Sequence, residues 1–348
     1  MSKKVLIIIV SYNSSDYIGD CLSSLENIVY PKDDFRILVV DNRSTDNSVE
    51  IIKKNFSEIE LFESQANLGF VGGNNFGFKY AIQNNFDYVY LLNPDTAVTP
   101  GFLDQVVKLA ESNQKIGAVQ SKLLLYHDQG LINSIGNEIH FLGLAFAGGY
   151  KQPDYPMIPK EITYPSGASV LIKVSALKGV GFFNDEFFMY HEDTDLGWRL
   201  WLGGYKVMLS PESVVYHKYE FSRNQQKYYY MERNRRLMIL QNYKIGTIIL
   251  ILPACVLMGL AMFIYSLFSG WAWQNLKVYW YFFQPSSWIK LFKTRKQIRK
   301  KCKITDREML TRFVGRVEFH DFGNPILKYV VNPIFSLYFW LLKKIIVW

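Results

Sequence analysis

Short apolar segments alternate with segments of helical periodicity over the first 120 residues, and this alternation restricts the possible folds more than any other feature. Residues 5–10 are an unbroken aliphatic run, which predicts a strand buried on both faces, and residues 35–40 predict a second such strand. Residues 15–28 carry apolar side chains at helical spacing between them. Strands that alternate with helices predict right-handed βαβ units and a mostly parallel sheet. The pattern further predicts strands at 61–62, at 88–92 and from 117 onward, helices at 46–55 and 101–112, and a glycine-rich turn followed by a helix over 69–84.

The next part of the chain is less regular. Residues 121–165 are rich in Gly, Pro and Tyr, and predict loops around a site. After them the pattern predicts a strand at 170–173, a helix at 196–202, short strands at 206–209 and 214–216, and a helix at 225–243.

Polar residues stand at the ends of three predicted strands. Tyr12 and Asn13 follow the first strand, Asp41 ends the second, and Asn93 and Asp95 follow the strand at 88–92. Parallel α/β sheets bind ligands beyond the carboxyl ends of their strands. Since these side chains recur at the same topological place, we expect them to surround one binding site.

Charge is distributed unevenly along the chain. The net charge is +8, but residues 271–325 hold 12 basic and 4 acidic side chains and residues 326–348 add three lysines, so the first 270 residues carry −3. This asymmetry indicates attachment to an anionic surface at one end only, a membrane or a nucleic acid. The three cysteines show no metal-binding spacing, so we expect a reducing compartment and no disulfide or zinc framework.

Residues 245–276 contain no charged side chain, and this segment is long enough to form a membrane-spanning helix. A buried core helix is the alternative, and Pro253 weakens a simple span. Residues 290–303 hold eight Lys or Arg and no acid, which the positive-inside rule places in the cytoplasm. The residues before 245 contain no signal peptide, so we expect them in the cytoplasm too.

A single crossing would separate these two cytoplasmic parts. We therefore expect residues 245–289 to form a hydrophobic hairpin or interfacial helices, with residues 290–303 on anionic headgroups rather than on nucleic acid. Residues 326–348 are apolar but contain three lysines, and predict an interfacial amphipathic tail. The chain thus divides into an α/β domain over 1–243 and a membrane-associated helical region over 244–348.

Two short motifs allow more than one interpretation by themselves. Asp95 in Asn93-Pro94-Asp95 suits a Mg²⁺ or Mn²⁺ ion that phosphates also bind, although the same tripeptide is an ordinary turn. Glycines over 67–75 would let a backbone approach a phosphate or a nucleotide, or simply form a tight loop. They match neither a dinucleotide fingerprint nor a Walker loop.

A third motif crowds three carboxylates into four residues, Glu192, Asp193 and Asp195. Like charges at this spacing raise at least one pKa, which suits a general base, while helix capping explains one or two of them equally well. Arg199 lies four residues after Asp195 and can pair with it along a helix. His217, which follows a predicted strand, is by itself more typical of a structural histidine.

Together these motifs carry a resemblance to a known family. Val-Ser-Tyr-Asn at 10–13, Val-Val-Asp-Asn-Arg-Ser-Thr-Asp at 39–46, Asn-Leu-Gly-Phe-Val-Gly-Gly-Asn-Asn at 67–75, Leu-Leu-Asn-Pro-Asp at 91–95 and His-Glu-Asp-Thr-Asp-Leu-Gly-Trp-Arg at 191–199 stand in one order. Over residues 4–243 the chain closely resembles family 2 inverting glycosyltransferases of the GT-A fold, especially the rhamnosyltransferase-like and galactofuranosyltransferase-like branch. The basic tail is similar to the membrane-associated tail of that branch.

The resemblance implies a role for each matching residue. Asp193 would be the catalytic base, and Asp95 would hold a divalent metal, Mg²⁺ or Mn²⁺, together with His217. Asn93 replaces the first acid of the family's metal motif. The nucleotide-sugar-binding residues would be Tyr12, Asn13, Asp41, Asn67, Gly72, Asn93 and Asp95. The acceptor side would be formed by Glu192, Asp195, Trp198 and Arg199.

These roles predict an inverting transferase that moves a sugar, with rhamnose from dTDP-rhamnose as the first candidate, to a lipid-linked (polyprenyl-diphosphate) saccharide. We expect it at the cytoplasmic face of the cell membrane, in cell-surface polysaccharide synthesis. One alternative is a processive polysaccharide synthase, although residues 224–236 lack the Gln-x-x-Arg-Trp motif of those enzymes. Another is a non-catalytic membrane scaffold with a degenerate transferase fold.

Overall fold

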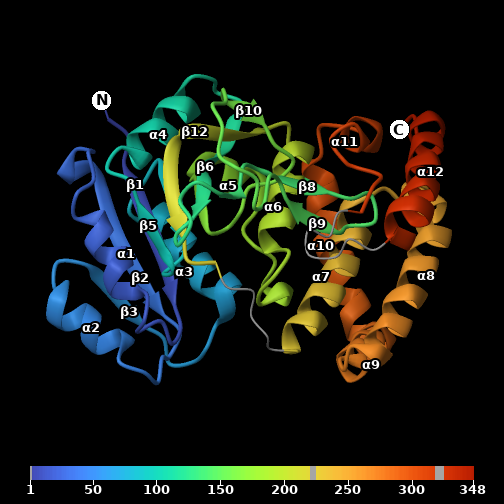
Figure 1. The fold of residues 1–348 in the computed structure, drawn as a ribbon, viewed down its shortest axis with the longest axis horizontal. Helices are drawn as coiled ribbons and strands as arrows, with labels where there is room; N and C mark the ends of the chain where they lie inside the picture. Colours follow the sequence, from blue (N-terminus) through green and yellow to red (C-terminus); the bar gives the residue numbers. More distant parts are fainter. Residues whose placement is uncertain (1, 220–224, 318–324) are drawn as a thin grey trace. The chain divides into compact units, whose positions relative to one another are not determined.

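The computed structural model describes residues 2–219, 225–317 and 325–348 (Figure 1). The chain divides into two units. Unit 1 comprises Met1–Asn137, Ala147–Met189 and Tyr205–Glu220, and unit 2 comprises Glu138–Phe146, Tyr190–Gly204 and Phe221–Trp348. Unit 2 therefore takes in residues 190–204 and the helix after 225, besides the helical region predicted over 244–348.

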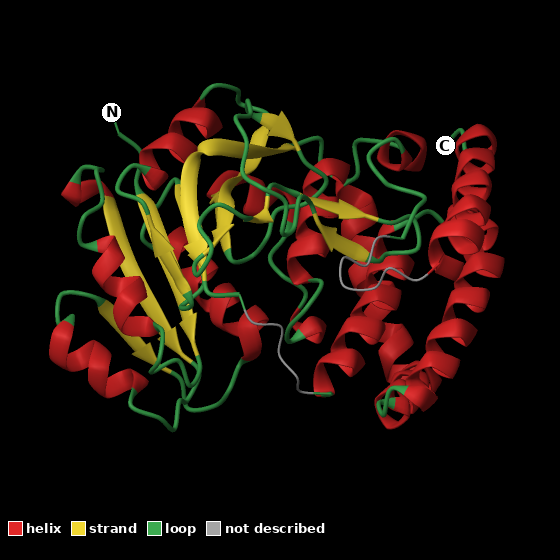
Figure 2. Cartoon of the chain, viewed as in Figure 1, coloured by secondary structure: helices red, strands yellow, loops and turns green. Residues whose placement is uncertain are grey.

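Unit 1 is built on a ten-stranded sheet with the order β10-β12-β6-β11-β4-β1-β2-β3, on which β5 pairs with β12 and β7 with β6. Figure 2 shows the strands in yellow and the helices in red. Strands β3, β2, β1 and β4 are parallel to one another, as are β6 and β12, and β11 lies antiparallel between β4 and β6. The predicted α/β fold with a mostly parallel sheet is thereby confirmed. The strands are β1 (Val5–Ser11), β2 (Phe35–Asp41), β3 (Glu60–Glu63), β4 (Tyr88–Leu92), β5 (Thr96–Val98), β6 (Ile116–Leu125), β7 (Ile132–Ser134), β10 (Lys160–Glu161), β11 (Ser169–Lys173) and β12 (Lys206–His217).

Helices cover both faces of this sheet, which explains the unbroken apolar run of β1. Ile7 and Ile9 face the core formed with α1, α2 and α4, whereas Ile8 and Val10 contact α3 on the other face. All five residues Val5–Ile9 are fully buried. The helices of unit 1 are α1 (Ile18–Leu25), η1 (Lys32–Asp34), α2 (Ser48–Asn55), α3 (Gly69–Gln83), α4 (Phe102–Glu111), α5 (Val174–Val180) and η2 (Asp185–Phe187).

The predicted glycine-rich turn is confined to Gly69, which has a φ of +69° and is also the first residue of α3, so the glycines after it are helical. These helical glycines serve close packing. A Cβ atom on Gly73 would lie 2.8 Å from Val10 Cγ1, and one on Gly77 would lie 2.6 Å from Ile8 Cδ1. Only residues without a side chain let α3 approach β1 this closely.

Long-range pairing also corrects the interpretation of later segments. The expected loop region at 121–165 contains the end of β6 together with β7 and β10, which pair with strands of the sheet, and with β8 and β9, which pair with each other. The two strands expected at 206–209 and 214–216 are one strand, β12, which pairs with β6 on both sides of a register shift between Ser210 and Val214. The helix expected to begin at 196 begins at Glu192.

Unit 2 is mainly helical. Trp198 of α6 is fully buried against Tyr243 and Phe313, at ring-centroid distances of 4.6 and 4.7 Å. Among the described residues, one helix, α8, is long and apolar enough to cross a membrane, judged by length and composition alone. The helices are α6 (Glu192–Leu202), α7 (Gln226–Asn242), α8 (Ile245–Phe268), α9 (Ala272–Phe283), α10 (Pro285–Lys301), α11 (Asp306–Leu310) and α12 (Asn332–Ile345), with a π-helical turn η3 (Leu327–Val331) before α12. Strands β8 (Asn137–Ile139) and β9 (Ala145–Ala147) form a separate pair.

Candidate functional site

The carboxyl ends of β1, β2, β4 and β12 lie on one edge of the unit 1 sheet. The parallel registers align Ser11 with Asp41 and Ile8 with Leu91. Strand β12 points the same way, because β6 and β4 are both antiparallel to β11 and β12 is parallel to β6. The structure therefore gathers the predicted residues of unit 1 at this edge: Tyr12, Asn13, Asp41, Asn67, Gly72, Asn93, Asp95 and His217.

Asp41 and Asn13 are joined through one serine. Ser44 donates its backbone N–H to Asp41 Oδ2 at 2.9 Å and its hydroxyl to Asp41 Oδ1 at 2.6 Å, and its Oγ accepts the Asn13 N–H at 2.9 Å. Asn13 has a positive φ of 48°, which asparagine tolerates, and its Oδ1 accepts the Thr45 N–H at 2.8 Å. Tyr12 is half-exposed. A buried carboxylate beside an exposed aromatic ring is suited to a nucleoside, which offers hydroxyls and a flat base.

The loop before α3 is tied to the end of β2. Asn42 donates its Nδ2 to the Gly69 carbonyl at 3.0 Å, and Gly69 donates its N–H to Asn67 Oδ1 at 2.8 Å. The Oδ1 atom of Asn42 is buried without a hydrogen-bond partner. Gly72 lies in the first turn of α3, where its N–H donates to the Leu68 carbonyl at 3.2 Å and the Val71 N–H donates to the Phe188 carbonyl at 3.0 Å.

Asp95 and His217 meet because β5 pairs antiparallel with β12, with Thr96 opposite His217. Asp95 Oδ2 lies 3.3 Å from His217 Nε2, and the other ring nitrogen, Nδ1, is 2.9 Å from Asn133 Oδ1. In the neutral ring with its N–H on Nδ1, that N–H donates to Asn133 and Nε2 carries the lone pair on the side of Asp95. Asp95 Oδ1 is buried and has no hydrogen-bond partner.

This pair fits a divalent cation. Asp95 Oδ2 and His217 Nε2 lie close enough together that both could contact one ion, and carboxylate oxygen with imidazole nitrogen is a donor set that suits Mn²⁺. The orphaned Oδ1 atom is a further acceptor. In the part of the chain that the structure describes, no cluster of three or more His, Cys, Asp or Glu side chains could hold a metal. Asp95 and His217 thus supply two ligands at most, and a bound diphosphate and water would have to supply the others.

The sequence patterns did not predict three residues that form hydrogen bonds with the predicted site residues or the loop beside them. Asn42, Ser44 and Asn133 orient the predicted residues rather than replace them. Ser44 and Asn42 stand within the Val-Val-Asp-Asn-Arg-Ser-Thr-Asp motif and could have been found there. Asn133 carries no such signal, because it lies on β7 in the region taken for loops.

The other predicted residues belong to unit 2 and open α6. Asp193 is partly exposed, and its Oδ1 accepts the Thr194 N–H at 2.6 Å. Glu192 is buried and its Oε2 has no hydrogen-bond partner. Burial, with a contribution from the neighbouring Asp193 carboxylate, raises the pKa of Glu192 well above its ordinary value. The expected raised pKa among these carboxylates therefore falls on Glu192.

Asp195 lies at the centre of a buried network. Its Oδ2 accepts Arg199 Nε at 2.7 Å, and its Oδ1 accepts Gln241 Nε2 at 2.6 Å and Asn242 Nδ2 at 2.8 Å. Asp195 is fully buried, and Arg199 and Trp198 are almost so. The acceptor-side role of these three residues stays a prediction, and the contacts that the structure gives them join α6 to the end of α7.

Comparison with known proteins shows which family the sequence matches. The family model described as glycosyl transferase family 2 matches residues 6–181. Poly-beta-1,6-N-acetyl-D-glucosamine synthase of Staphylococcus epidermidis is 27% identical over 215 residues, which are 61% of this chain and 49% of that protein. The chain thus spans about half the length of this curated relative.

Solved structures agree on the fold. GalNAc-T7 with UDP, GalNAc and Mn²⁺ superposes with a TM-score of 0.57 at 14% identity, over 69% of this chain and 48% of that one. S. aureus TarS 1–349 in complex with UDP superposes with a TM-score of 0.51 at 16% identity, over 98% of this chain and 90% of that one. Neither comparison singles out the rhamnosyltransferase-like or galactofuranosyltransferase-like branch.

Proposed function

Since the chain belongs to glycosyl transferase family 2, whose model covers half of its residues, we propose that it transfers a sugar from a nucleotide-diphosphate donor to a saccharide acceptor with inversion. The observation that carries this proposal is that the Asp95–His217 pair and Asp41 lie on the same carboxyl edge of the sheet. It combines a ligand pair for a cation with a buried carboxylate for a nucleoside.

Asp95 and His217 would hold Mg²⁺ or Mn²⁺ on the donor diphosphate. When bound, the cation neutralises the charge that develops on the leaving diphosphate. Asn133 keeps the His217 ring in one orientation and one tautomer, so Nε2 stays available as a ligand. Asp41 and Tyr12 would hold the ribose and base, with Asn13 and Ser44 fixing the loop around them.

Asp193 would remove the proton from the acceptor hydroxyl as that oxygen attacks the anomeric carbon. It is partly exposed, whereas its neighbours Glu192 and Asp195 are buried. A positioned carboxylate contributes about 10²–10⁴-fold to such a step. One base and one direct displacement invert the anomeric centre, because no covalent intermediate forms.

For the substrates we propose an envelope polysaccharide system at the cytoplasmic membrane face. The similar curated protein is named as a polysaccharide synthase, and the basic helical tail suits an anionic membrane surface. A polyprenyl-diphosphate saccharide is the acceptor that such a location favours. For the donor, dTDP-rhamnose is one candidate to test against UDP-sugars, since two structural neighbours carry UDP.

The test is a panel of nucleotide sugars with Mn²⁺ or Mg²⁺, first by thermal shift and then by sugar transfer. The donor that raises the melting temperature should also be consumed. Asp193→Asn should keep the thermal shift and lose at least about 100-fold of the transfer rate. Asp128→Asn, an exposed acid elsewhere in unit 1, is the control and should keep both. Full activity of Asp193→Asn would refute the base, and a panel without any shift or transfer would refute the transferase.

A processive polysaccharide synthase is a second candidate, favoured by the named synthase among the relatives. The absence of Gln-x-x-Arg-Trp at 224–236 argues against it. Product length separates the two, because a processive enzyme yields long polymers at limiting acceptor and a single-transfer enzyme yields one added sugar.

A further inference from the structure

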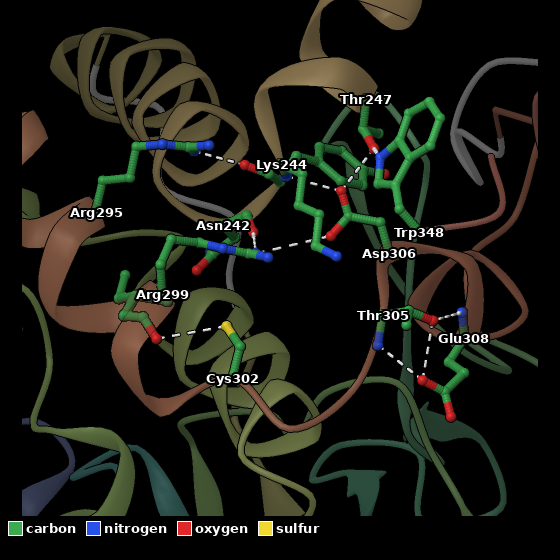
Figure 3. A network of polar contacts seen from close by, with 12 residues as sticks. Asn242, Lys244, Thr247, Arg295, Arg299, Cys302, Thr305, Asp306, Glu308 and Trp348 are labelled. Carbon is green, nitrogen blue, oxygen red and sulfur yellow. Dashed lines mark hydrogen bonds and ion pairs between the residues drawn. The ribbon is translucent and has the colours of Figure 1, made fainter.

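The apolar helix α8 is held by buried polar groups at its start (Figure 3). Asp306, which is 1% exposed, accepts the Lys244 N–H at 2.7 Å and the Thr247 hydroxyl at 2.6 Å. Its carboxylate therefore caps α8 from a separate helix, α11. Trp348 donates its Nε1 to Thr247 Oγ1 at 3.0 Å.

The charged helix α7 runs antiparallel along α8. The two helices are joined at Lys244, and at the other end Tyr228 of α7 stacks on Trp271, just beyond α8, at 4.8 Å. Midway, a Cβ atom on Gly259 of α8 would lie 3.9 Å from Arg236 Nη2. The guanidinium of Arg236 thus lies against the middle of α8, while it stacks at 4.6 Å on Tyr279 of α9.

Residues of α10, which follow α8 in the chain, contact the residues just before the start of α8. Arg295 of α10 donates to the carbonyls of Leu240 and Tyr243 at 2.5 Å, and Arg299 donates to the Asn242 carbonyl at 2.8 Å (Figure 3). The residues that follow α8 therefore come back, through α9 and α10, to its first turn.

These contacts oppose a transmembrane α8. If α8 crossed a bilayer, both α7 and the returning segment would have to share its depth. Charged side chains within the hydrocarbon are costly, and both segments are rich in them. In α7 these are Lys227, Glu232, Arg233, Arg235 and Arg236, and in α10 they are Lys290, Lys293, Arg295, Lys296, Arg299, Lys300 and Lys301.

The outer side of these helices is nonetheless strongly apolar. Six aliphatic residues of α8 that recur every three or four positions are each between 47% and 63% exposed. They are Ile245, Ile249, Leu252, Val256, Leu260 and Ile264. Helices α9 and α12 add exposed Trp273, Trp280, Phe283, Leu337, Trp340 and Ile345. We call these twelve residues the apolar surface.

The basic residues of α10 fall into two groups, one that contacts α7 and one that is exposed. Arg295 and Arg299 point inward to the α7 carbonyls, whereas Lys293, Lys296 and Lys300 are exposed. Its first turns also expose Trp288 and Phe292. Exposed lysines next to exposed aromatic residues match the headgroup region of an anionic bilayer.

We propose that α8 lies in the plane of an anionic lipid bilayer rather than across it. The apolar surface enters one leaflet by about 5–10 Å, and the α10 lysines contact lipid phosphates. The inference deepens the proposed membrane attachment and does not depend on sugar transfer, so the two fail in separate assays.

Cysteine accessibility in bacterial cells that express the full chain tests the orientation. In a background of Cys21→Ala, Cys255→Ser and Cys302→Ser, a single Ser269→Cys places a thiol just beyond α8. Lys54→Cys in unit 1 is the control. An impermeant maleimide should label neither thiol in intact cells and both in inside-out vesicles. Labelling of Ser269→Cys in intact cells would show a spanning α8 and overturn the proposal.

Vesicle flotation of the purified full chain tests the surface without that background. Binding to phosphatidylcholine vesicles should rise when phosphatidylglycerol is added. The triple variant K293E/K296E/K300E should lower the binding constant for these anionic vesicles at least about tenfold, while K54E/K79E/K115E on unit 1 should not change it. The triple variant L252E/V256E/L260E should abolish binding to both kinds of vesicle. Binding that none of the unit 2 variants alters, or no binding of the wild-type chain, would contradict the proposal.

Discussion

Asp95 in unit 1 and Asp195 in unit 2 are the same residue type in opposite surroundings. Asp95 stands at the edge of the sheet with one carboxylate oxygen lacking any hydrogen-bond partner. Asp195 is fully buried, and its two oxygens accept three hydrogen bonds from Arg199, Gln241 and Asn242. The unit 1 site keeps acceptors available for a ligand, whereas the unit 2 network uses its acceptors to hold helices together. Residue type therefore does not distinguish an acid with an unpaired oxygen from one whose oxygens are occupied in packing, but its partners do.

The largest effect that this comparison predicts is on folding. Asp195→Ala leaves a buried guanidinium and two amides without their acceptor, so we expect the free energy of unfolding to fall by about 3–5 kcal/mol. Urea unfolding measures it. Asp128→Ala, at an exposed site, should stay within about 0.5 kcal/mol of the wild type. Equal values for the two variants would remove the contrast between the units.

Asp95→Asn should act the other way, with activity lost and stability kept. We expect transfer to fall about 10²–10³-fold while the free energy of unfolding changes by less than about 0.5 kcal/mol. Titration of Mn²⁺ in the presence of UDP, followed by calorimetry, should show the lost metal affinity directly.

Asn133→Leu should lower metal affinity less than Asp95→Asn does. The substitution leaves both ligands in place but removes the acceptor for His217 Nδ1, so we expect metal affinity to fall about 10–100-fold. Unchanged Mn²⁺ affinity would show that Asn133 does not orient the ring.

Substitutions at two glycines of unit 1 should change its stability in opposite directions. Gly73→Ala should destabilise unit 1 by about 1–3 kcal/mol, because the new methyl group overlaps Val10. Gly19→Ala on α1 meets only Ile51 Cγ2 at 3.9 Å and should stabilise it by about 0.5–1 kcal/mol. Thermal unfolding compares them, and a harmless Gly73→Ala would show that α3 can move away from β1.

The smallest effect concerns Glu192 and depends on pH. Its pKa is raised in the folded state, so the folded chain holds a proton that the unfolded chain has lost, and stability falls as pH rises above the ordinary glutamate pKa. Glu192→Gln removes this loss. We expect it to raise the free energy of unfolding near pH 8 and to leave it nearly unchanged near pH 4. Urea unfolding at both values checks the sign.

Local patterns predicted most elements of unit 1. The apolar run of β1, the helical spacing of α1 and the polar strand ends follow from periods of two and 3.6 residues, which depend on near neighbours only. Corrections came where distant segments meet. The glycines of α3 suggested a turn, because their contact with Ile8 and Val10 is not visible in a local pattern. Strands β7 to β10 were missed since such short strands take their stability from the strands with which they pair, and the partner of β10 is distant in the sequence.

The sequence by itself determined the α/β class, the edge of the sheet that carries polar side chains, and the set of acids available for chemistry. Only the tertiary structure decided their burial and their hydrogen-bond partners. Antiparallel pairing of β5 with β12 brought His217 to Asp95, and packing of α6 on α7 buried Asp195. The physical reason is that strand ends follow from local periodicity, whereas the burial and partners of a side chain depend on segments that are distant in the chain and adjacent only after folding.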